Sequence, residues 1–236
     1  MKSLKQMLDQ RKTYYDHEPA YRKLAEKGEQ GWRSKSGQTA NFRLYWNLAF
    51  APGFLPKPEA RVLDFGCGGG ELAIMLARAG YEVIGTDYSA TAIKLAIQNA
   101  QRAKLKQVKF YCQDALKPQL RSSFFEVIFS LNVLHCLIGQ DRMTYLNNCR
   151  KLLKKCGLLV ITSMVDLPKD KKIIKEFGIN PRTGLDKYRS RCYASEKQIL
   201  AEFRRAGFKV IFFARGEARD SYPGDEDYFW ILQKRL

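Results

Sequence analysis

The spacing of apolar residues changes near residue 60 and divides the chain into two segments. Residues 1–60 are polar and aromatic and favour helices, with a loop over Gly28–Gln38 and a proline cluster over Ala51–Pro58. From Arg61 onward, short apolar runs typical of buried strands alternate with segments of helical periodicity. The predicted strands are Arg61–Phe65, Tyr81–Thr86, Val108–Cys112, Phe125–Ser130, Leu158–Ser163, Lys209–Ala214 and Tyr228–Gln233. The predicted helices are Glu71–Ala79, a Ser89-capped helix to about Arg102, Asp141–Leu153 and Ser195–Ala206.

This alternation predicts an α/β fold, in which helices cover both faces of a mainly parallel sheet. We expect the final strand to run antiparallel, because Pro223-Gly224 and no helical pattern precede it. Residues 1–60 are predicted to form an N-terminal helical cap, and residues 61–236 the main domain. The basic segment 166–192 interrupts the alternation and is interpreted as a cap insertion, because long irregular insertions in compact domains are usually functional.

Composition narrows the class of protein. The 236 residues are 45% hydrophobic, enough for a sizeable core. No uncharged apolar run reaches the roughly 18 residues of a membrane helix, and Met1–Lys12 lacks the apolar run of a signal peptide. We therefore expect a cytoplasmic protein without membrane insertion. Six cysteines without C-x-x-C spacing and only two histidines predict no metal site, and most of the cysteines lie in apolar runs, which suits buried thiols.

The net charge of +17 is the most unusual bulk property. Residues 150–219 contribute 18 Lys plus Arg against 7 Asp plus Glu, an excess of +11. This excess is compatible with an ordinary solvated surface or with a face that binds nucleic acid or another polyanion. No recognisable nucleic-acid-binding module accompanies it, so both interpretations stay open.

A glycine-rich loop follows the first predicted strand and precedes the first helix of the main domain. Gly66, Gly68 and Gly70 have G-x-G-x-G spacing, which allows a sharp turn and close approach of the backbone to a ligand. A dinucleotide would place pyrophosphate at the start of the following helix, where Glu71 would repel it. Asp64, just before the loop, instead suits a cationic ligand such as S-adenosylmethionine, which carries a sulfonium and an amino group.

Two further carboxylates follow the next two predicted strands. Asp87 lies 23 residues after Asp64, where a carboxylate accepts hydrogen bonds from ribose hydroxyls. Asp114 follows the third strand, where it is suited to an adenine amino group. The alternatives are an acid that interacts with a helix dipole for Asp87 and an ordinary turn residue for Asp114.

Together these motifs resemble class I S-adenosylmethionine-dependent methyltransferases. The matching segments are Val62–Gly70, Gly85–Ser89, Gln113–Ala115, Val127–Ser130 and Gly157–Val160. The resemblance implies a Rossmann-like, seven-stranded, mostly parallel sheet. It places Gly66, Gly68 and Gly70 on the methionine part, Asp87 on the ribose, Asp114 with Ala115 on the adenine, and Leu131 near the sulfonium. Asp64, Cys67 and Tyr88 are further cofactor-binding candidates from the same loops.

The methyl acceptor is less well defined. Methyl transfer is an in-line displacement to which alignment contributes much of the rate. His135 is a candidate general base, although a structural role is the alternative. Arg43, Trp46 and Tyr188 are candidate substrate residues from the cap and the insertion, and Arg191 suits an anionic acceptor. The run Ser130–Val133 lacks the prolines of enzymes that methylate nucleic-acid amino groups.

We therefore expect a methyltransferase that acts on a small-molecule acceptor. An RNA or protein methyltransferase is the alternative that the positive charge favours. A regulator that binds the cofactor without catalysis is a third possibility, and a dehydrogenase fits least well. The oligomeric state is left open.

Overall fold

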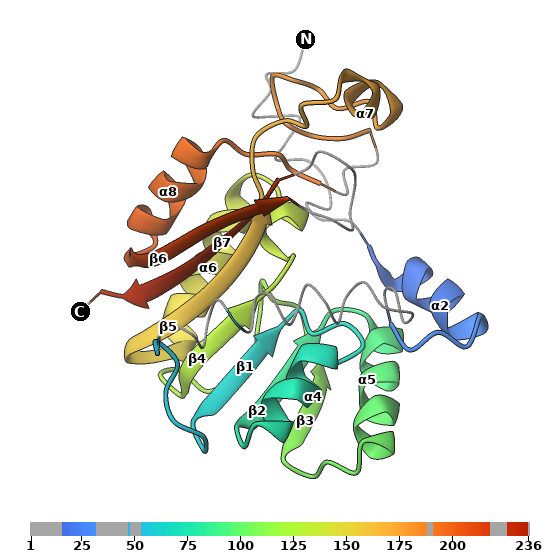
Figure 1. Cartoon of the computed structure of the whole chain (residues 1–236), viewed down its shortest axis with the longest axis vertical. Helices are drawn as coiled ribbons and strands as arrows, with labels where there is room; N and C mark the ends of the chain where they lie inside the picture. The colour runs from blue at the N-terminus through green and yellow to red at the C-terminus, as the bar shows by residue number, and fades with distance from the viewer. Residues whose placement is uncertain (1–15, 32–46, 48–52, 188–190, 218–225, 236) are drawn as a thin grey trace.

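A central sheet organises the computed structural model, which describes residues 16–31, 47, 53–187, 191–217 and 226–235. Within these residues the sheet has seven strands in the order β3-β2-β1-β4-β5-β7-β6 (Figure 1). The strands are β1 (Arg61–Phe65), β2 (Glu82–Asp87), β3 (Val108–Cys112), β4 (Phe125–Ser130), β5 (Leu153–Met164), β6 (Phe208–Glu217) and β7 (Glu226–Lys234). The helices are α2 (Glu18–Glu26), α4 (Glu71–Arg78), α5 (Ala90–Arg102), the 3-10 helix η1 (Leu134–Cys136), α6 (Gln140–Leu152), α7 (Lys171–Glu176) and α8 (Glu196–Arg205).

The strand pairing confirms the predicted fold class. β1 pairs in parallel with β2 and β4, and β3 and β5 extend the parallel part on either side. β7 is antiparallel to both of its neighbours, β5 and β6. The parallel strands therefore end along one border of the sheet, which we call the carboxyl edge. The opposite border, where β5 and β6 begin and β7 ends, is the amino edge.

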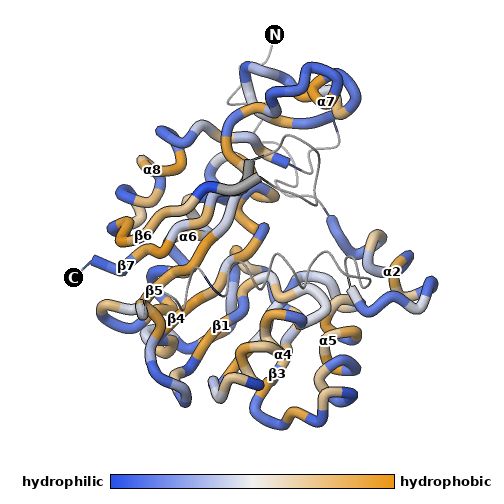
Figure 2. The backbone as a smooth tube through the Cα atoms, viewed as in Figure 1, coloured by the Kyte–Doolittle hydropathy of each residue, from blue (hydrophilic) through white to orange (hydrophobic). Residues whose placement is uncertain are grey.

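Two apolar cores lie on the two faces of the sheet. In β7, Tyr228, Trp230 and Leu232 face one core, and Phe229 and Ile231 face the other, as the two-residue period of a strand requires. Helices α6 and α8 cover the first face, and α4 with the end of α5 covers the second. The apolar residues concentrate on the strands and on the inner sides of these helices (Figure 2).

A buried ion pair joins α6 to α8. Arg142 is 1% exposed and donates from Nε and Nη2 to the carboxylate of Glu202 at 2.8 to 3.1 Å. Its Nη1 donates to the carbonyl oxygen of Leu134 at 2.8 Å. One guanidinium thus connects both helices to η1, just beyond the carboxyl end of β4.

The structure corrects some expected details. β5 begins at Leu153, five residues before the predicted start, because Leu153 already pairs with Phe125 of β4. The insertion contains the short helix α7. The prediction of buried thiols is wrong for two cysteines, since Cys112 and Cys156 are exposed. No helix within the described ranges is long and apolar enough to cross a membrane.

Candidate cofactor and acceptor site

The glycine loop forms the turn from β1 into α4. Gly66, Gly68 and Gly70 have φ angles of 91°, 52° and 80°, in the left-handed region that glycine adopts without a steric cost. The backbone N–H groups of Gly66 and Cys67 donate to the carbonyl oxygen of Thr86 in β2, at 2.8 and 2.9 Å. These bonds hold the loop against the carboxyl end of β2, where the sequence placed the ligand.

Asp64 and Asp87 bring a buried and a half-buried carboxylate to this loop. Asp64 is 3% exposed and accepts from the N–H of Ala73, the third residue of α4, at 3.1 Å. Asp87 accepts from the N–H groups of Gly68 and Ser89, each at 2.9 Å. Among the described residues, neither carboxylate forms an ion pair with a basic side chain.

Burial makes the charged forms of both acids costly. Burial, opposed by the hydrogen bond from Ala73 and assisted by the nearby charge of Asp87, raises the pKa of Asp64 to about 7. Burial also raises the pKa of Asp87, with an added contribution from Glu18. The thiol of Cys67 lies beside both acids, and burial followed by their charges raises its pKa well above the ordinary value. The site is therefore a group of acidic side chains that a cation would stabilise.

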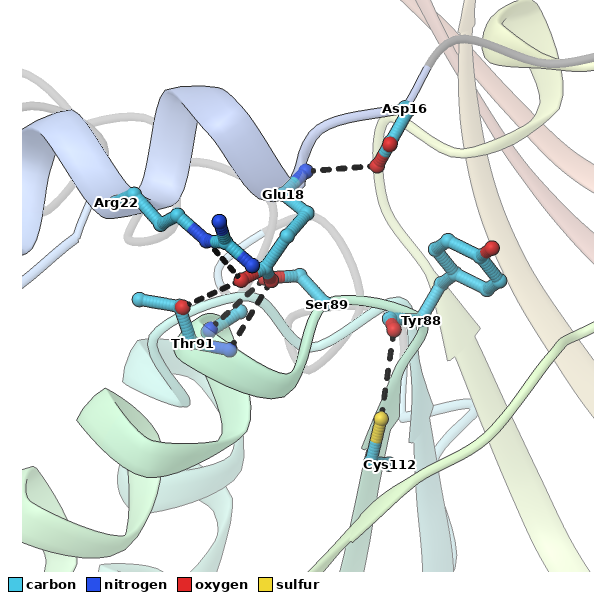
Figure 3. Close-up of polar contacts among 8 residues, drawn as sticks. Asp16, Glu18, Arg22, Tyr88, Ser89, Thr91 and Cys112 are labelled. Carbon is cyan, nitrogen blue, oxygen red and sulfur yellow. Dashed lines mark hydrogen bonds and ion pairs between the residues drawn. The ribbon is translucent and has the colours of Figure 1, made fainter.

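The N-terminal segment adds a third carboxylate. Glu18 of α2 accepts hydrogen bonds from Ser89 Oγ at 2.6 Å and from Thr91 N and Oγ1 at 3.1 and 2.7 Å (Figure 3). Burial alone would raise the pKa of Glu18, but the hydrogen bonds from Ser89, Thr91 and Arg22 lower it to about 2. Glu18 therefore stays ionised and fastens α2 to the N-terminus of α5, where the helix dipole favours a negative charge.

Residues 16–31 cross the glycine loop at two more points. A Cβ atom on Gly68 would lie 2.5 Å from the hydroxyl of buried Tyr21. Asn99 Nδ2 of α5 donates to the carbonyl oxygens of Gln30 and Gly69, both at 2.9 Å. We call residues 16–31 the N-terminal strap. The sequence pattern did not mark Glu18 or Asn99 as site residues, since residues 1–60 showed only a polar and aromatic composition that favours helices, and Asn99 lies inside the helix that Ser89 caps.

The ends of β2, β3 and β4 hold the other cofactor candidates. Asp114 Oδ1 accepts from the N–H of Leu116 at 2.8 Å, and the carbonyl oxygen of Ala115 accepts from Asn148 Nδ2 at 2.9 Å. Leu131 is 8% exposed, directly after β4. Tyr88 is 44% exposed, and its carbonyl oxygen accepts from the thiol of Cys112 (Figure 3). All four follow strands at the carboxyl edge, as predicted.

His135 is buried in η1 rather than exposed at the surface. It is 2% exposed, and its Nδ1 accepts from the N–H of Met164 at 3.3 Å. Its carbonyl oxygen accepts from the N–H of Cys192 at 2.7 Å. Burial, followed by the charge of Arg191, lowers its pKa well below the ordinary value. These contacts connect η1 to β5 and to the insertion, which favours the structural interpretation of a neutral imidazole.

The insertion returns to the carboxyl edge through Arg191 and Cys192. Arg191 Nη1 lies 3.8 Å from the sulfur of Cys136, and Val165 bridges to Ala194 just beyond β5. The charge of Arg191 lowers the pKa of Cys136, although burial, the largest influence, raises it. The three predicted acceptor residues Arg43, Trp46 and Tyr188 lie outside the described residues.

Comparison with known proteins identifies the family. The family model of the methyltransferase domain matches residues 56–207. This chain belongs to the methyltransferase domain family. The predicted family is thereby confirmed, and with it S-adenosylmethionine as the cofactor.

Individual relatives of this methyltransferase domain match it over part of their length. Ubiquinone biosynthesis O-methyltransferase of Cereibacter sphaeroides is 35% identical over 115 residues, which cover 49% of this chain and 45% of the relative. The match thus spans less than half the length of that relative.

Two solved structures share the fold over almost the whole chain. The [4+2]-cyclase SpnF has a TM-score of 0.73 at 18% identity and covers 95% of this chain and 97% of its own. Magnesium protoporphyrin IX methyltransferase of Synechocystis, solved with bound S-adenosylhomocysteine, has a TM-score of 0.66 at 21% identity over 92% and 93% of the two chains. One of the two is a cyclase, so the fold alone does not define the reaction.

The residues of the methyltransferase domain fit S-adenosylmethionine better than a dinucleotide. A pyrophosphate needs backbone N–H groups at a helix N-terminus. Here the carboxylate of Asp64 already occupies the start of α4, and the N–H groups of Gly66, Cys67 and Gly68 donate to protein oxygens. A ligand with a positive charge instead supplies the cationic partner that Asp64 and Asp87 lack among the described residues.

Proposed function

We propose that this chain transfers a methyl group from S-adenosylmethionine to an oxygen atom of a small-molecule acceptor. The buried Asp64 beside the half-buried Asp87, neither with a basic partner among the described residues, is the observation that carries the proposal. The name of the ubiquinone biosynthesis relatives supports an oxygen acceptor. When bound, S-adenosylmethionine supplies an electrophilic methyl group on a sulfonium centre.

In this proposal the carboxyl edge binds the cofactor from the glycine loop to the end of β4. Gly66, Gly68 and Gly70 allow the tight turn that brings the loop backbone to the methionine part, and Asp64 offsets its positive charge. Asp87 accepts hydrogen bonds from the ribose hydroxyls. Each of its oxygens has two lone pairs, so its bonds to Gly68 and Ser89 leave capacity for a ligand.

The adenine is assigned to the ends of β2 and β3. Asp114 and Ala115 lie on one side of this region, and the exposed ring of Tyr88 offers a surface on which a base could stack. Leu131, together with the neutral thiol of Cys67, supplies an apolar contact near the sulfonium.

The acceptor is assigned to the space bordered by η1 and the insertion. Arg191 would bind an anionic or polar group of the acceptor. Arg43, Trp46 and Tyr188 stay candidate substrate residues that would cover the bound acceptor. We assign His135 to positioning η1 rather than to proton transfer, because its ring is buried and Nδ1 already accepts a hydrogen bond. A His135→Gln variant separates the roles. If His135 were a general base, the variant would have a lower kcat and a changed pH profile. If His135 positions η1, the variant should instead have a lower unfolding temperature.

Calorimetry and a transfer assay test the proposal. S-adenosylmethionine and S-adenosylhomocysteine should bind, and NAD should not. Transfer of a labelled methyl group should then occur to members of a panel of phenols, catechols and hydroxy acids, with amines, RNA and a protein mixture as comparisons. Transfer only to RNA or protein would replace the proposed acceptor class. Cofactor binding without turnover on any acceptor would favour the regulator, and saturable NAD binding would overturn the cofactor site.

A further inference from the structure

Three segments distant in sequence meet at the amino edge of the sheet. They are the passage from α6 into β5, the passage from α8 into β6, and the end of β7. Lys234 Nζ donates to the carbonyl oxygen of Leu153 at 2.6 Å, and Arg235 N donates to that of Gly207 at 3.0 Å. A Cβ atom on Gly207 would lie 2.6 Å from Nε of Arg150. These contacts make the three segments one continuous surface.

Basic side chains gather on this surface, and the segments that carry them contain no acidic residues. We call its six exposed basic residues, Lys151, Lys155, Arg204, Arg205, Lys209 and Arg235, the basic edge. Residues 150–157, 204–209 and 234–235 contain no Asp or Glu. In the part of the chain that the structure describes, none of the six forms an ion pair.

The few neighbouring acids have other partners. Glu126 of β4 pairs with Arg61 and Lys154, and Glu202 pairs with the buried Arg142. Burial lowers the pKa of the adjacent Lys234, and the charge of Arg150 lowers it further. The local field is therefore positive and repels further cations, so it attracts an anionic partner.

Helix dipoles account for only part of this charge. Lys151 lies in the last turn of α6, and Arg204 and Arg205 lie in the last turn of α8, where basic residues offset the negative end of the helix. Lys155, Lys209 and Arg235 lie on or next to strands, whose net dipoles are small. Half of the basic edge therefore has no role in stabilising a helix.

We propose that the basic edge binds the phosphate backbone of a double-stranded nucleic acid, separately from methyl transfer. Along the strand direction, the five-residue strand β1 separates the amino edge from the glycine loop by about 15 Å, and the basic edge lies further across the sheet, beside β5, β7 and β6. A phosphate held at the basic edge would therefore not deliver its own nucleotide to the cofactor. The surface is a docking site and not an acceptor site.

The chemistry of the surface favours nucleic acid over a membrane or a single-stranded partner. The exposed large apolar side chains among the described residues are Tyr88, Ile97, Tyr111 and Phe213, all outside the three segments. Stable membrane anchoring usually combines basic residues with an apolar or lipid anchor, and binding of single strands uses exposed aromatic side chains. Neutralisation of duplex phosphates needs only lysine and arginine.

Salt-dependent binding to a short fluorescent DNA duplex tests the proposal. The strand-end variant Lys155→Gln, Lys209→Gln, Arg235→Gln removes three charges without touching a helix terminus. The matched control Lys94→Gln, Lys171→Gln, Lys172→Gln removes three exposed charges elsewhere. We expect the strand-end variant to bind at least tenfold more weakly, with a slope of log K against log salt shallower by about 3, and the control to bind nearly like the parent chain.

The outcomes separate this proposal from the proposed function. S-adenosylmethionine affinity, measured on the same samples, should be equal in the parent chain and both variants, which also shows that they are folded. Equal losses in the strand-end and control variants would overturn the basic edge as the binding surface. So would the absence of duplex binding at low salt, or binding to phosphatidylglycerol vesicles in place of the duplex. None of these results bears on cofactor binding or on the acceptor panel.

Discussion

Binding of S-adenosylmethionine should release a proton from Asp64, and this linkage should make the affinity depend on pH. Without ligand, burial and then the charge of Asp87 raise the pKa of Asp64 from its ordinary value of 3.8 to about 7. A bound cation favours the ionised carboxylate and lowers this pKa again. Below pH 7 the ligand must therefore displace a proton before the carboxylate can offset its charge.

The size of the effect follows from a single proton. The apparent Kd should rise roughly tenfold for each pH unit below 7, and should level off above it. At about pH 6, binding should release about 0.9 proton, and at about pH 8 only about 0.1. Calorimetric titration in buffers of different ionisation enthalpy measures both the affinity and the number of protons released.

Two controls isolate Asp64 as the titrating group. Asp64→Asn should bind more weakly at high pH and should lose the pH dependence. S-adenosylhomocysteine has no sulfonium charge, so its affinity should depend less on pH. An unchanged Kd between about pH 6 and about pH 8, with no proton release, would refute the coupling between the buried acid and the cationic ligand.

Three further substitutions test the site and the scaffold. Asp87→Ala should raise the Kd for S-adenosylmethionine about 10- to 100-fold, because ribose hydroxyls lose their acceptor; unchanged calorimetric affinity would exclude the ribose assignment. Glu18→Gln should speed amide hydrogen exchange across the N-terminal strap, whereas Glu26→Gln, on an exposed position of α2, should not; equal rates in both would contradict the fastening role. Arg142→Ala should lower the free energy of unfolding by about 3–5 kcal/mol in urea, because Glu202 keeps a buried, uncompensated charge, and Arg142→Met with Glu202→Leu should recover most of it. A loss in the single variant no larger than that of a surface substitution would contradict this reasoning.

Local patterns in the sequence were sufficient for most of the fold and for the cofactor loop. Each predicted strand and helix from Arg61 to Ala206 is present, because apolar periodicity and caps such as Ser89 and Ser195 act within a few residues. The glycine spacing also has a local cause, since three left-handed φ angles restrict those positions to glycine. The exception is the start of β5, where tertiary pairing with β4 extends the strand through residues that look polar.

The site beyond the loop depends on contacts that sequence patterns do not record. Glu18 meets Ser89 and Thr91 across more than 70 residues of chain, and no periodicity encodes such a pairing. His135 could be a general base or a structural residue by sequence, and only the structure shows that the end of β5 and the insertion bury it.

The sequence alone therefore determined the family, the cofactor class and the order of the strands along the chain, because these depend on short motifs and on alternation. Only the tertiary structure decided which acids titrate near neutral pH and which basic residues share a surface. Burial next to Asp87 changes Asp64 from an ordinary acid into one that titrates near neutrality. Likewise, the sequence showed a net charge of +17 and an excess over residues 150–219, but not which of these charges share a surface. Folding brings the ends of α6, α8 and β7 together, and so turns scattered lysines and arginines into a single surface.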